Sequence, residues 1–380
     1  MPKPPAPIAF VDLVAQQKRI REKVEARFIR ILDHGAYING PEVRELEQAL
    51  CDFTGCARAL AVGNGTDALL IPMMAMDLGP GDAVFIPGFT YNATCSAVMI
   101  AGAVPVFVDV RAVDFCMDPV DLEQKIEEAL AKGLEPRLVI AVDLFGIPAD
   151  YNAIFDVASR HGLQVMADAA QSFGCRFEGR YAGNIAPVTA TSFFPAKSLG
   201  CYGDGGAIMF ADEALFEASE QIRWHGTDAA RRESVRPGMN GRLDSIQCAI
   251  VTEKLAIFGE ELDRRTELAR RYRERLSSAY DAQDHGQGRE SGWGYFTVAI
   301  NDRDAVQARL KEDGVPSAIY YPQPLHTMRA FERYAPMGGL PVSERLADRV
   351  LSLPLHPYLS DEQADYICER FLAAVERRNA

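Results

Sequence analysis

Lys197 stands in a segment that offers little other reason for a charged side chain. Residues 191–206 read TSFFPAKSLGCYGDGG, so aromatic, small and glycine residues surround this lysine. A lysine that such neighbours remove from water can act as an amine nucleophile. A single lysine is nevertheless usually a solvated surface charge. The residue therefore gains meaning only from other groups that lie near it in the fold.

Two further segments place polar groups directly after apolar runs, which is where ligands bind in an open α/β sheet. The sequence GNGTD at 63–67 precedes a helical pattern, and its glycines and N–H groups suit a phosphate. Asp168 follows the apolar run 163–167. Each feature also has a plain structural explanation, because Thr66, Asp67 or Asp168 could serve only as a helix cap.

The three places together match the needs of one cofactor. Pyridoxal 5'-phosphate (PLP) is bound through a lysine amine, a carboxylate beside its ring nitrogen and a site for its phosphate. Lys197, Asp168 and the Gly65-Thr66 turn supply these groups. The combination predicts a PLP site more strongly than any one of its members.

The chain also resembles the DegT/DnrJ/EryC1/StrS family of sugar aminotransferases, which have PLP fold type I, over nearly its whole length. After about residue 241 the sequence pattern changes to long charged helices. We therefore expect a large, mostly parallel-sheet domain at residues 1–240, including an N-terminal segment, and a smaller α+β domain at 241–380. The stretches that carry the resemblance are INGPEV at 38–43, GTDAL at 65–69, ADAAQS at 167–172, SFFPAK at 192–197, GDGG at 203–206, GMNGR at 238–242 and LPLHP at 353–357.

This resemblance implies a role for each residue of the site. Lys197 would carry the cofactor as a Schiff base and later move a proton, and Asp168 would pair with the pyridinium nitrogen. The other cofactor contacts would be Gln171 at the ring hydroxyl, Tyr91 stacked on the ring, Gly65, Thr66 and Ser192 at the phosphate, and Asn240 at the phosphate from a neighbouring subunit. A homodimer would then share its active sites.

Two residues are candidates for substrate contact by the same resemblance. Arg242 could meet a sugar carboxylate with two parallel hydrogen bonds, although an arginine there also occurs in relatives with neutral sugars. His326 lies in a segment similar to the family's sugar-nucleotide contact. Ordinary structural roles stay open for His326 and, as core packing, for Tyr91.

The resemblance implies transfer of an amino group from L-glutamate to a keto sugar nucleotide. The stretch CYGDGG at 201–206, together with TSFFP at 191–195, resembles the branch that acts on UDP-2-acetamido-2-deoxy-3-oxo-glucuronate in the synthesis of bacterial surface polysaccharide such as O-antigen. A 4-keto UDP- or dTDP-sugar and a non-catalytic PLP-binding regulator are the alternatives. A PLP-dependent sugar dehydratase would have histidine in place of Lys197.

Short apolar runs alternate with helical patterns, which predicts an α/β fold with a parallel sheet. A polar break is expected at 281–291. We expect strands at 59–62, 83–86, 104–108, 138–142, 163–167, 188–193, 206–210, 295–300 and 317–320, and helices at 67–76, 93–101, 119–131, 149–160, 245–258, 261–280, 303–313 and 361–377.

Composition excludes several classes of function. The net charge of −13 disfavours nucleic acid and anionic membranes as partners. No apolar run approaches the roughly 20 residues needed to span a bilayer, and the N-terminus lacks a signal-peptide core. The eight cysteines include no CxxC pair, so we expect no metal site, reduced thiols and a cytoplasmic protein.

Overall fold

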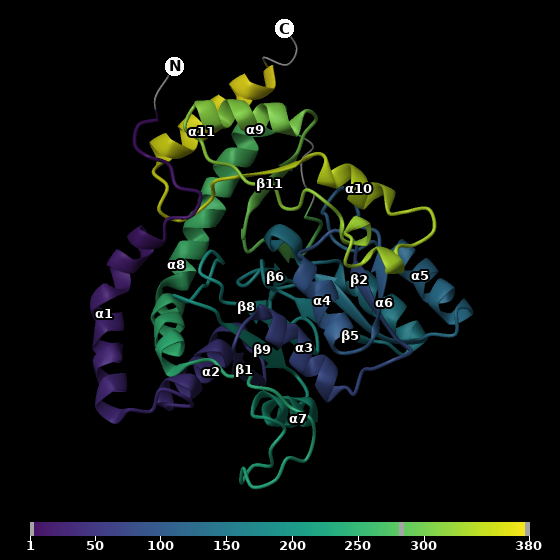
Figure 1. Cartoon of the computed structure of the whole chain (residues 1–380). Coiled ribbons are helices and arrows are strands. Elements are labelled where there is room, and N and C mark those ends of the chain that lie inside the picture. Colours follow the sequence, from purple (N-terminus) through teal and green to yellow (C-terminus); the bar gives the residue numbers. More distant parts are fainter. Residues whose placement is uncertain (1–3, 281–284, 377–380) are drawn as a thin grey trace.

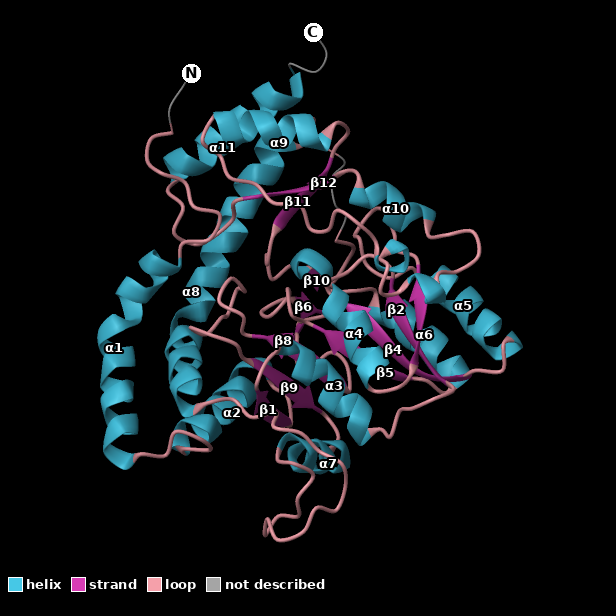
Figure 2. Ribbon diagram, viewed as in Figure 1, coloured by secondary structure: helices cyan, strands magenta, loops and turns pink. Residues whose placement is uncertain are grey.

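The computed structural model describes residues 4–280 and 285–376, and a seven-stranded sheet lies at its centre (Figures 1 and 2). In spatial order the strands are β1 (Arg58–Val62), β9 (Gly206–Phe210), β8 (Val188–Ser192), β5 (Gln164–Asp168), β4 (Glu135–Val142), β2 (Asp82–Pro87) and β3 (Val104–Val108). The strands from β8 to β3 are parallel, and β9 is antiparallel to both neighbours. The predicted α/β fold is confirmed.

Helices cover both faces of this sheet, because alternate side chains of each strand point to opposite sides. In β2, Val84 and Ile86 enter one core and Ala83 and Phe85 enter the other. The strands therefore read as continuous apolar runs, which is why the sequence revealed all seven. The first face carries α3 (Gly65–Ala75), α4 (Asn92–Ile100) and α7 (Glu213–Arg223); the second carries α5 (Pro119–Ala131), α6 (Tyr151–His161), α2 (Pro41–Thr54) and the first half of α8 (Ser245–Leu276).

A second, smaller core forms around the other half of α8. Phe258 packs in the core beneath α2, whereas Leu268 belongs to the smaller core, so one helix serves both. The division at residue 241 stays a prediction from sequence pattern. The remaining elements are α1 (Leu13–His34) beside α8, the antiparallel pair β11 (Phe296–Ala299) and β12 (Val350–Leu353), α9 (Arg303–Glu312), α10 (Pro341–Ala347), α11 (Asp361–Glu376) and the 3-10 turns η1 (Leu144–Gly146), η2 (Leu325–Thr327) and η3 (Glu332–Tyr334).

Several expected elements differ from the structure. The helices expected at 245–258 and 261–280 are one helix, since Gly259 faces open space and does not interrupt it. The strand expected at 317–320 is reduced to a single bridge between Ala318 and Ser352. Residues 281–284 of the expected polar break and residue 377 lie outside the described part. No described helix is long and apolar enough to cross a membrane.

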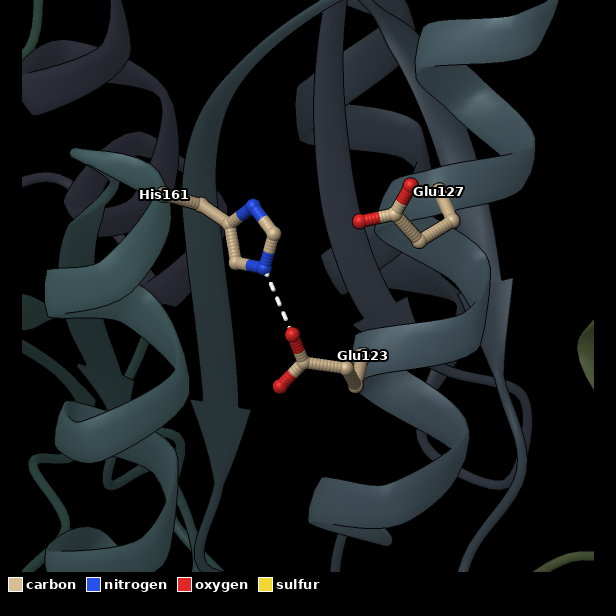
Figure 3. Close-up of side chains that lie close together, drawn as sticks. All are labelled: Glu123, Glu127 and His161. Carbon is tan, nitrogen blue, oxygen red and sulfur yellow. Dashed lines mark hydrogen bonds and ion pairs between the residues drawn. The ribbon is translucent and has the colours of Figure 1, made fainter.

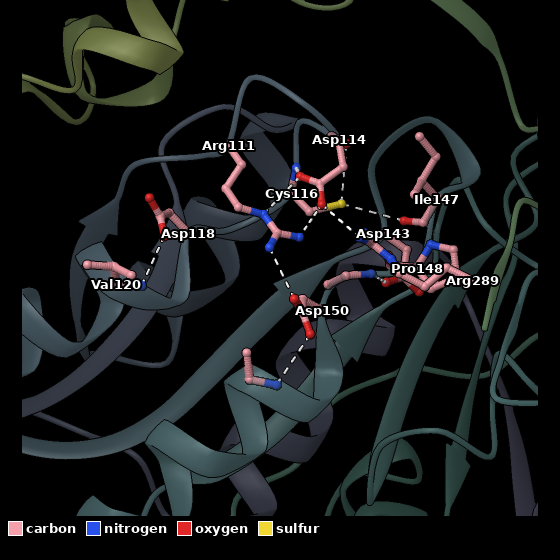
Figure 4. Close-up of polar contacts among 12 residues, drawn as sticks. Arg111, Asp114, Cys116, Asp118, Val120, Asp143, Ile147, Pro148, Asp150 and Arg289 are labelled. Atoms are coloured by element: carbon pink, nitrogen blue, oxygen red, sulfur yellow. Dashed lines mark hydrogen bonds and ion pairs between the residues drawn. The ribbon is translucent and has the colours of Figure 1, made fainter. Parts of the chain in front are cut away.

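The chain returns from α8 to the large sheet through a buried ionic clamp (Figure 4). Arg289 belongs to β10 (Arg289–Glu290), which pairs with β6 (Arg176–Phe177), itself paired with β7 (Arg180–Tyr181). The Arg289 guanidinium contacts Asp114 at 2.8 Å and donates from Nε to the Pro148 carbonyl at 2.7 Å. Six residues later, Tyr295 donates its N–H to the Phe145 carbonyl at 3.1 Å. The clamp thus brings Tyr295 to the edge of the sheet.

Candidate active site

One cavity lies at the carboxyl ends of the parallel strands and contains most of the residues that the sequence singled out. Its volume of about 320 Å³ is at the lower end of ligand pockets, which span roughly 300–1,000 Å³. Tyr295, Tyr320 and Tyr321 complete one wall. The predicted residues in its lining are Gly65, Thr66, Tyr91, Asp168, Gln171, Ser192 and Lys197.

Gly65, Thr66 and Ser192 meet at the start of α3, and we call them the phosphate cradle. Asn64 is the helix cap, because its side-chain oxygen accepts from the Asp67 N–H at 2.8 Å. Thr66 and Asp67 are therefore not the cap. The N–H groups of Gly65 and Thr66 have no partner within the helix and face the cavity end. A Cβ on Gly65 would lie only 2.7 Å from the Ser192 Cβ, so this approach requires glycine.

Asp168 ends β5 as a buried carboxylate with two neutral donors. Thr94 on α4 donates its hydroxyl to Oδ2 at 3.0 Å, and the Ala170 N–H donates to Oδ1 at 3.1 Å. Burial raises the pKa of Asp168, while the Ala170 N–H, Thr94 and the positive charge of Lys197 oppose this shift. The carboxylate is held in place with room to accept one more hydrogen bond from the cavity.

The Lys197 amine reaches the same cavity from the loop after β8. Its backbone N–H donates to the Phe194 carbonyl at 2.8 Å, but its amine makes no hydrogen bond to any described residue. Burial lowers the pKa of Lys197, and the nearby Asp168 carboxylate opposes that shift. The side chain is half-buried. It is thus a partly desolvated amine and not a freely solvated surface charge.

Gln171 is fixed in orientation by hydrogen bonds at both ends of its amide. Its Oε1 accepts from the Phe145 N–H at 2.9 Å, and its Nε2 donates to the Tyr321 hydroxyl at 2.8 Å. The Tyr321 ring lies 5.9 Å from the ring of Tyr91, which is 55% exposed at the cavity. The two rings are inclined by 36° and give the cavity an aromatic wall that can contact an aromatic ring.

Three predicted residues do not line the cavity of the described chain. Asn240 is exposed, and Arg242 stacks on the Trp224 ring at 4.3 Å, although the adjacent Gly241 carbonyl accepts from the Gly63 N–H beside the cradle. His326 is buried in η2, with Nε2 3.0 Å from Glu344 Oε1. This contact favours the structural role that the sequence left open for His326.

Some residues of the site escaped sequence reasoning. Thr94 lies in the first turn of α4, three residues after Tyr91 at the N-cap, and this short spacing was an available signal. Tyr321 stands in the segment YYPQPLH at 320–326, from which only the histidine was chosen. Tyr295 is far away in sequence and reaches the cavity through the Arg289 clamp, so no local pattern indicated it.

Within the described chain, one group of side chains has the spacing of metal ligands, and it lies outside the cavity. Donor atoms of Glu123 and Glu127 on α5 and of His161 on α6 lie within 4.8 Å of one another (Figure 3). His161 Nε2 is 2.7 Å from Glu123 Oε1, and Arg160 pairs with the same carboxylate. Glu123 is thus already engaged by His161 and Arg160, and we assign the group no metal.

The donors of the cavity fit PLP in chemistry. The cradle offers free N–H groups and a hydroxyl to a phosphate, and a side chain on Gly65 would fill it. A buried carboxylate suits a protonated ring nitrogen, and an amine without a partner suits an aldehyde. The residues that line the cavity therefore fit this cofactor.

Comparison with known proteins agrees with this geometry. The model of the DegT/DnrJ/EryC1/StrS aminotransferase family matches residues 18–372. UDP-2-acetamido-2-deoxy-3-oxo-D-glucuronate aminotransferase of Pseudomonas aeruginosa is 44% identical over 95% of this chain and 98% of its own.

Solved structures show the same likeness. A DegT DnrJ EryC1 StrS aminotransferase from Brucella abortus has a TM-score of 0.95 and 43% identity, covering 97% of this chain and 99% of its own. NtdA from Bacillus subtilis, solved with bound cofactor PMP, has a TM-score of 0.88 and 28% identity. The match covers 97% of this chain and 85% of NtdA. The chain belongs to the DegT/DnrJ/EryC1/StrS aminotransferase family.

Proposed function

We propose that this aminotransferase uses PLP to move an amino group from L-glutamate to a keto sugar nucleotide, namely UDP-2-acetamido-2-deoxy-3-oxo-glucuronate. The observation that carries the proposal is the single cavity in which the Lys197 amine, the Asp168 carboxylate and the phosphate cradle meet. The 44% identity to UDP-2-acetamido-2-deoxy-3-oxo-D-glucuronate aminotransferase of Pseudomonas aeruginosa supports this substrate.

Lys197 and Asp168 divide the acid and base work between them. When bound, PLP supplies an aldehyde that accepts the amino group and a ring that withdraws electrons from the donor's α-carbon. Lys197, with its lowered pKa, takes and returns the α-carbon proton as a free amine. Asp168, when ionised, would hold a proton on the ring nitrogen. Gln171 and Tyr91 would contact the ring and help to orient it.

A second subunit completes the site in this proposal. Tyr91 and Phe194 line the cavity and remain 55% and 52% exposed, so a second subunit could cover them. Asn240 and Arg242, which do not reach their own cavity, would contact the phosphate and the substrate across a two-fold interface. We therefore propose a homodimer with shared active sites.

The cellular setting follows from the chemistry of the substrates. Glutamate and nucleotide sugars are cytoplasmic metabolites, and the eight free cysteines accord with a reducing compartment. The product would serve bacterial surface polysaccharide, of the O-antigen or lipopolysaccharide type. A net charge of −13 speaks against nucleic acid or a membrane as a partner.

Replacing Lys197 tests the proposed function. Wild-type protein with PLP should show the visible absorption band of lysine-bound cofactor, and L-glutamate should abolish it. The Lys197→Ala protein should lack this band and lose about 10²–10⁴-fold in turnover, because its base is gone. Lys18→Ala, at an exposed lysine, is the control and should behave as wild type. A wild-type spectrum that glutamate does not change would refute transamination.

Gly65→Ala tests the phosphate cradle. The new Cβ would collide with Ser192, so PLP affinity should fall by about 1–3 kcal/mol, or roughly 5- to 150-fold in Kd. Gly79→Ala is the matched control, since a Cβ at Gly79 meets no atom within 4 Å. Fluorescence titration of the cofactor-free proteins measures both. Equal PLP affinities in the two variants would show that the phosphate binds at another place.

Mixing two inactive variants tests the shared site. Lys197→Ala and Asn240→Ala subunits, each with low activity alone, should recover about a quarter of wild-type activity after unfolding and refolding together, because mixed dimers hold one intact site. Refolding each variant alone is the control. If each site belongs to one subunit, mixing should restore nothing.

The sugar is tested by competition between ketones. A coupled glutamate assay should show turnover of the 3-keto UDP-hexuronate at least about tenfold faster, in kcat/KM, than that of 4-keto UDP- or dTDP-sugars. Arg242→Lys should lose this preference because one point charge replaces a two-pronged donor. Turnover of a 4-keto sugar alone would establish the alternative substrate class.

A further inference from the structure

Asp143 is a buried carboxylate to which the proposed chemistry assigns no task. It follows β4, next to the catalytic strand, and its N–H donates to the Asp168 carbonyl at 3.1 Å. Its side chain is fully buried and forms no ion pair with a described cation. Burial raises the pKa of Asp143 to about 6, and the charge of Asp168 adds to this shift. A carboxylate buried without a cation is costly, so its retention calls for a reason.

The partners of Asp143 connect three segments behind the cavity. Oδ1 accepts from the Ala149 N–H at 2.9 Å and from the Tyr151 hydroxyl at 2.8 Å. Oδ2 accepts from the Ser172 hydroxyl at 3.0 Å. These donors belong to the turn after β4, the start of α6 and the turn after β5. Figure 4 draws Asp143 beside the residues of the first turn, Ile147 and Pro148.

The turn after β4 and the turn after β5 both contact or contain Gln171. Ser172 is its direct neighbour in the chain, and Phe145, in the first turn, donates its N–H to the Gln171 oxygen at 2.9 Å. Phe145 has a φ of 62°, a left-handed conformation that a bulky residue adopts only when its surroundings enforce it. Asp143 precedes Phe145 by two residues, and its carboxylate accepts from the Ala149 N–H, four residues after Phe145. This hydrogen bond therefore joins the two ends of the turn.

We propose that Asp143 is a positioning residue, which acts through Ser172 and the Phe145 turn to hold the Gln171 amide, and with it Tyr321, against the cofactor cavity. The inference rests on the proposed function, because it concerns the edge of the cofactor that Gln171 faces. Asp143 itself touches neither cofactor nor substrate. Its effect must therefore pass through Gln171, and this can be measured.

A double-mutant cycle between Asp143 and Gln171 tests the coupling. Asp143→Ala and Gln171→Ala should each lower kcat/KM by about tenfold and shift the absorption maximum of bound PLP. The kcat/KM of the double variant should lie within about threefold of that of the less active single variant, since the second change removes a contact that is already lost. A loss of about 100-fold, the product of the singles, would overturn the proposal.

Asp143→Asn provides rescue by a near-isosteric side chain. Its oxygen can still accept from Ala149 and Tyr151, and its amide can donate to the Ser172 hydroxyl, so activity and spectrum should stay near wild type. A variant as impaired as Asp143→Ala would show that charge, and not position, matters. Failure of wild-type protein to bind PLP would instead refute the proposed function itself.

Asp109→Ala is the matched control for lost stability. Asp109 follows β3 of the same sheet, and its carboxylate accepts from Val342 N–H at 2.9 Å and from the Ser343 N–H and hydroxyl at 2.8 and 2.6 Å. Its removal should lower thermal stability as Asp143→Ala does, leave the cofactor spectrum unchanged and combine additively with Gln171→Ala. If Asp109→Ala also shifts the cofactor spectrum, Asp143 has only a general structural role.

Discussion

The constraint on which the site depends is that one cavity holds both the partly desolvated Lys197 amine and the buried Asp168 carboxylate. Burial lowers the pKa of Lys197 and raises that of Asp168, and each charge partly offsets the effect on the other. In water, each group would have its ordinary pKa. The parallel register of β4, β5 and β8 brings Asp168 and the loop that carries Lys197 to one edge of the sheet, and helices cover both of its faces.

The sequence revealed those parts of the site whose signals are local. Gly65, Asp168 and Lys197 each follow a strand buried on both faces, and such strands are plain in the sequence as apolar runs. The cradle was recognised, but its cap was not: Asn64 performs the role that Thr66 and Asp67 seemed suited to. Asn64, Thr66 and Asp67 all have side chains that can cap a helix, and only the backbone geometry selects one of them.

Contacts between distant segments could not be predicted in this way. Tyr295 reaches the cavity because Arg289 is anchored on Asp114 and Pro148, about 140 to 175 positions earlier in the chain. The separation of α8 into two expected helices failed for a related reason: Gly259 has low helix propensity, yet the cores on both sides of it hold one continuous axis. Tertiary packing overrode the local preference in each case.

The placement of Arg242 bears on how an acidic chain can bind an anionic sugar nucleotide. Arg231 and Arg242 stack on the Trp224 ring at 3.7 and 4.3 Å, and neither forms an ion pair with a described carboxylate. An aromatic face fixes a guanidinium without neutralising it, whereas a salt bridge would fix it and consume its charge. The segment that carries Asn240 thus holds positive charge in a defined position and leaves it available. This is the property that a contact to a phosphate or carboxylate in a neighbouring subunit requires.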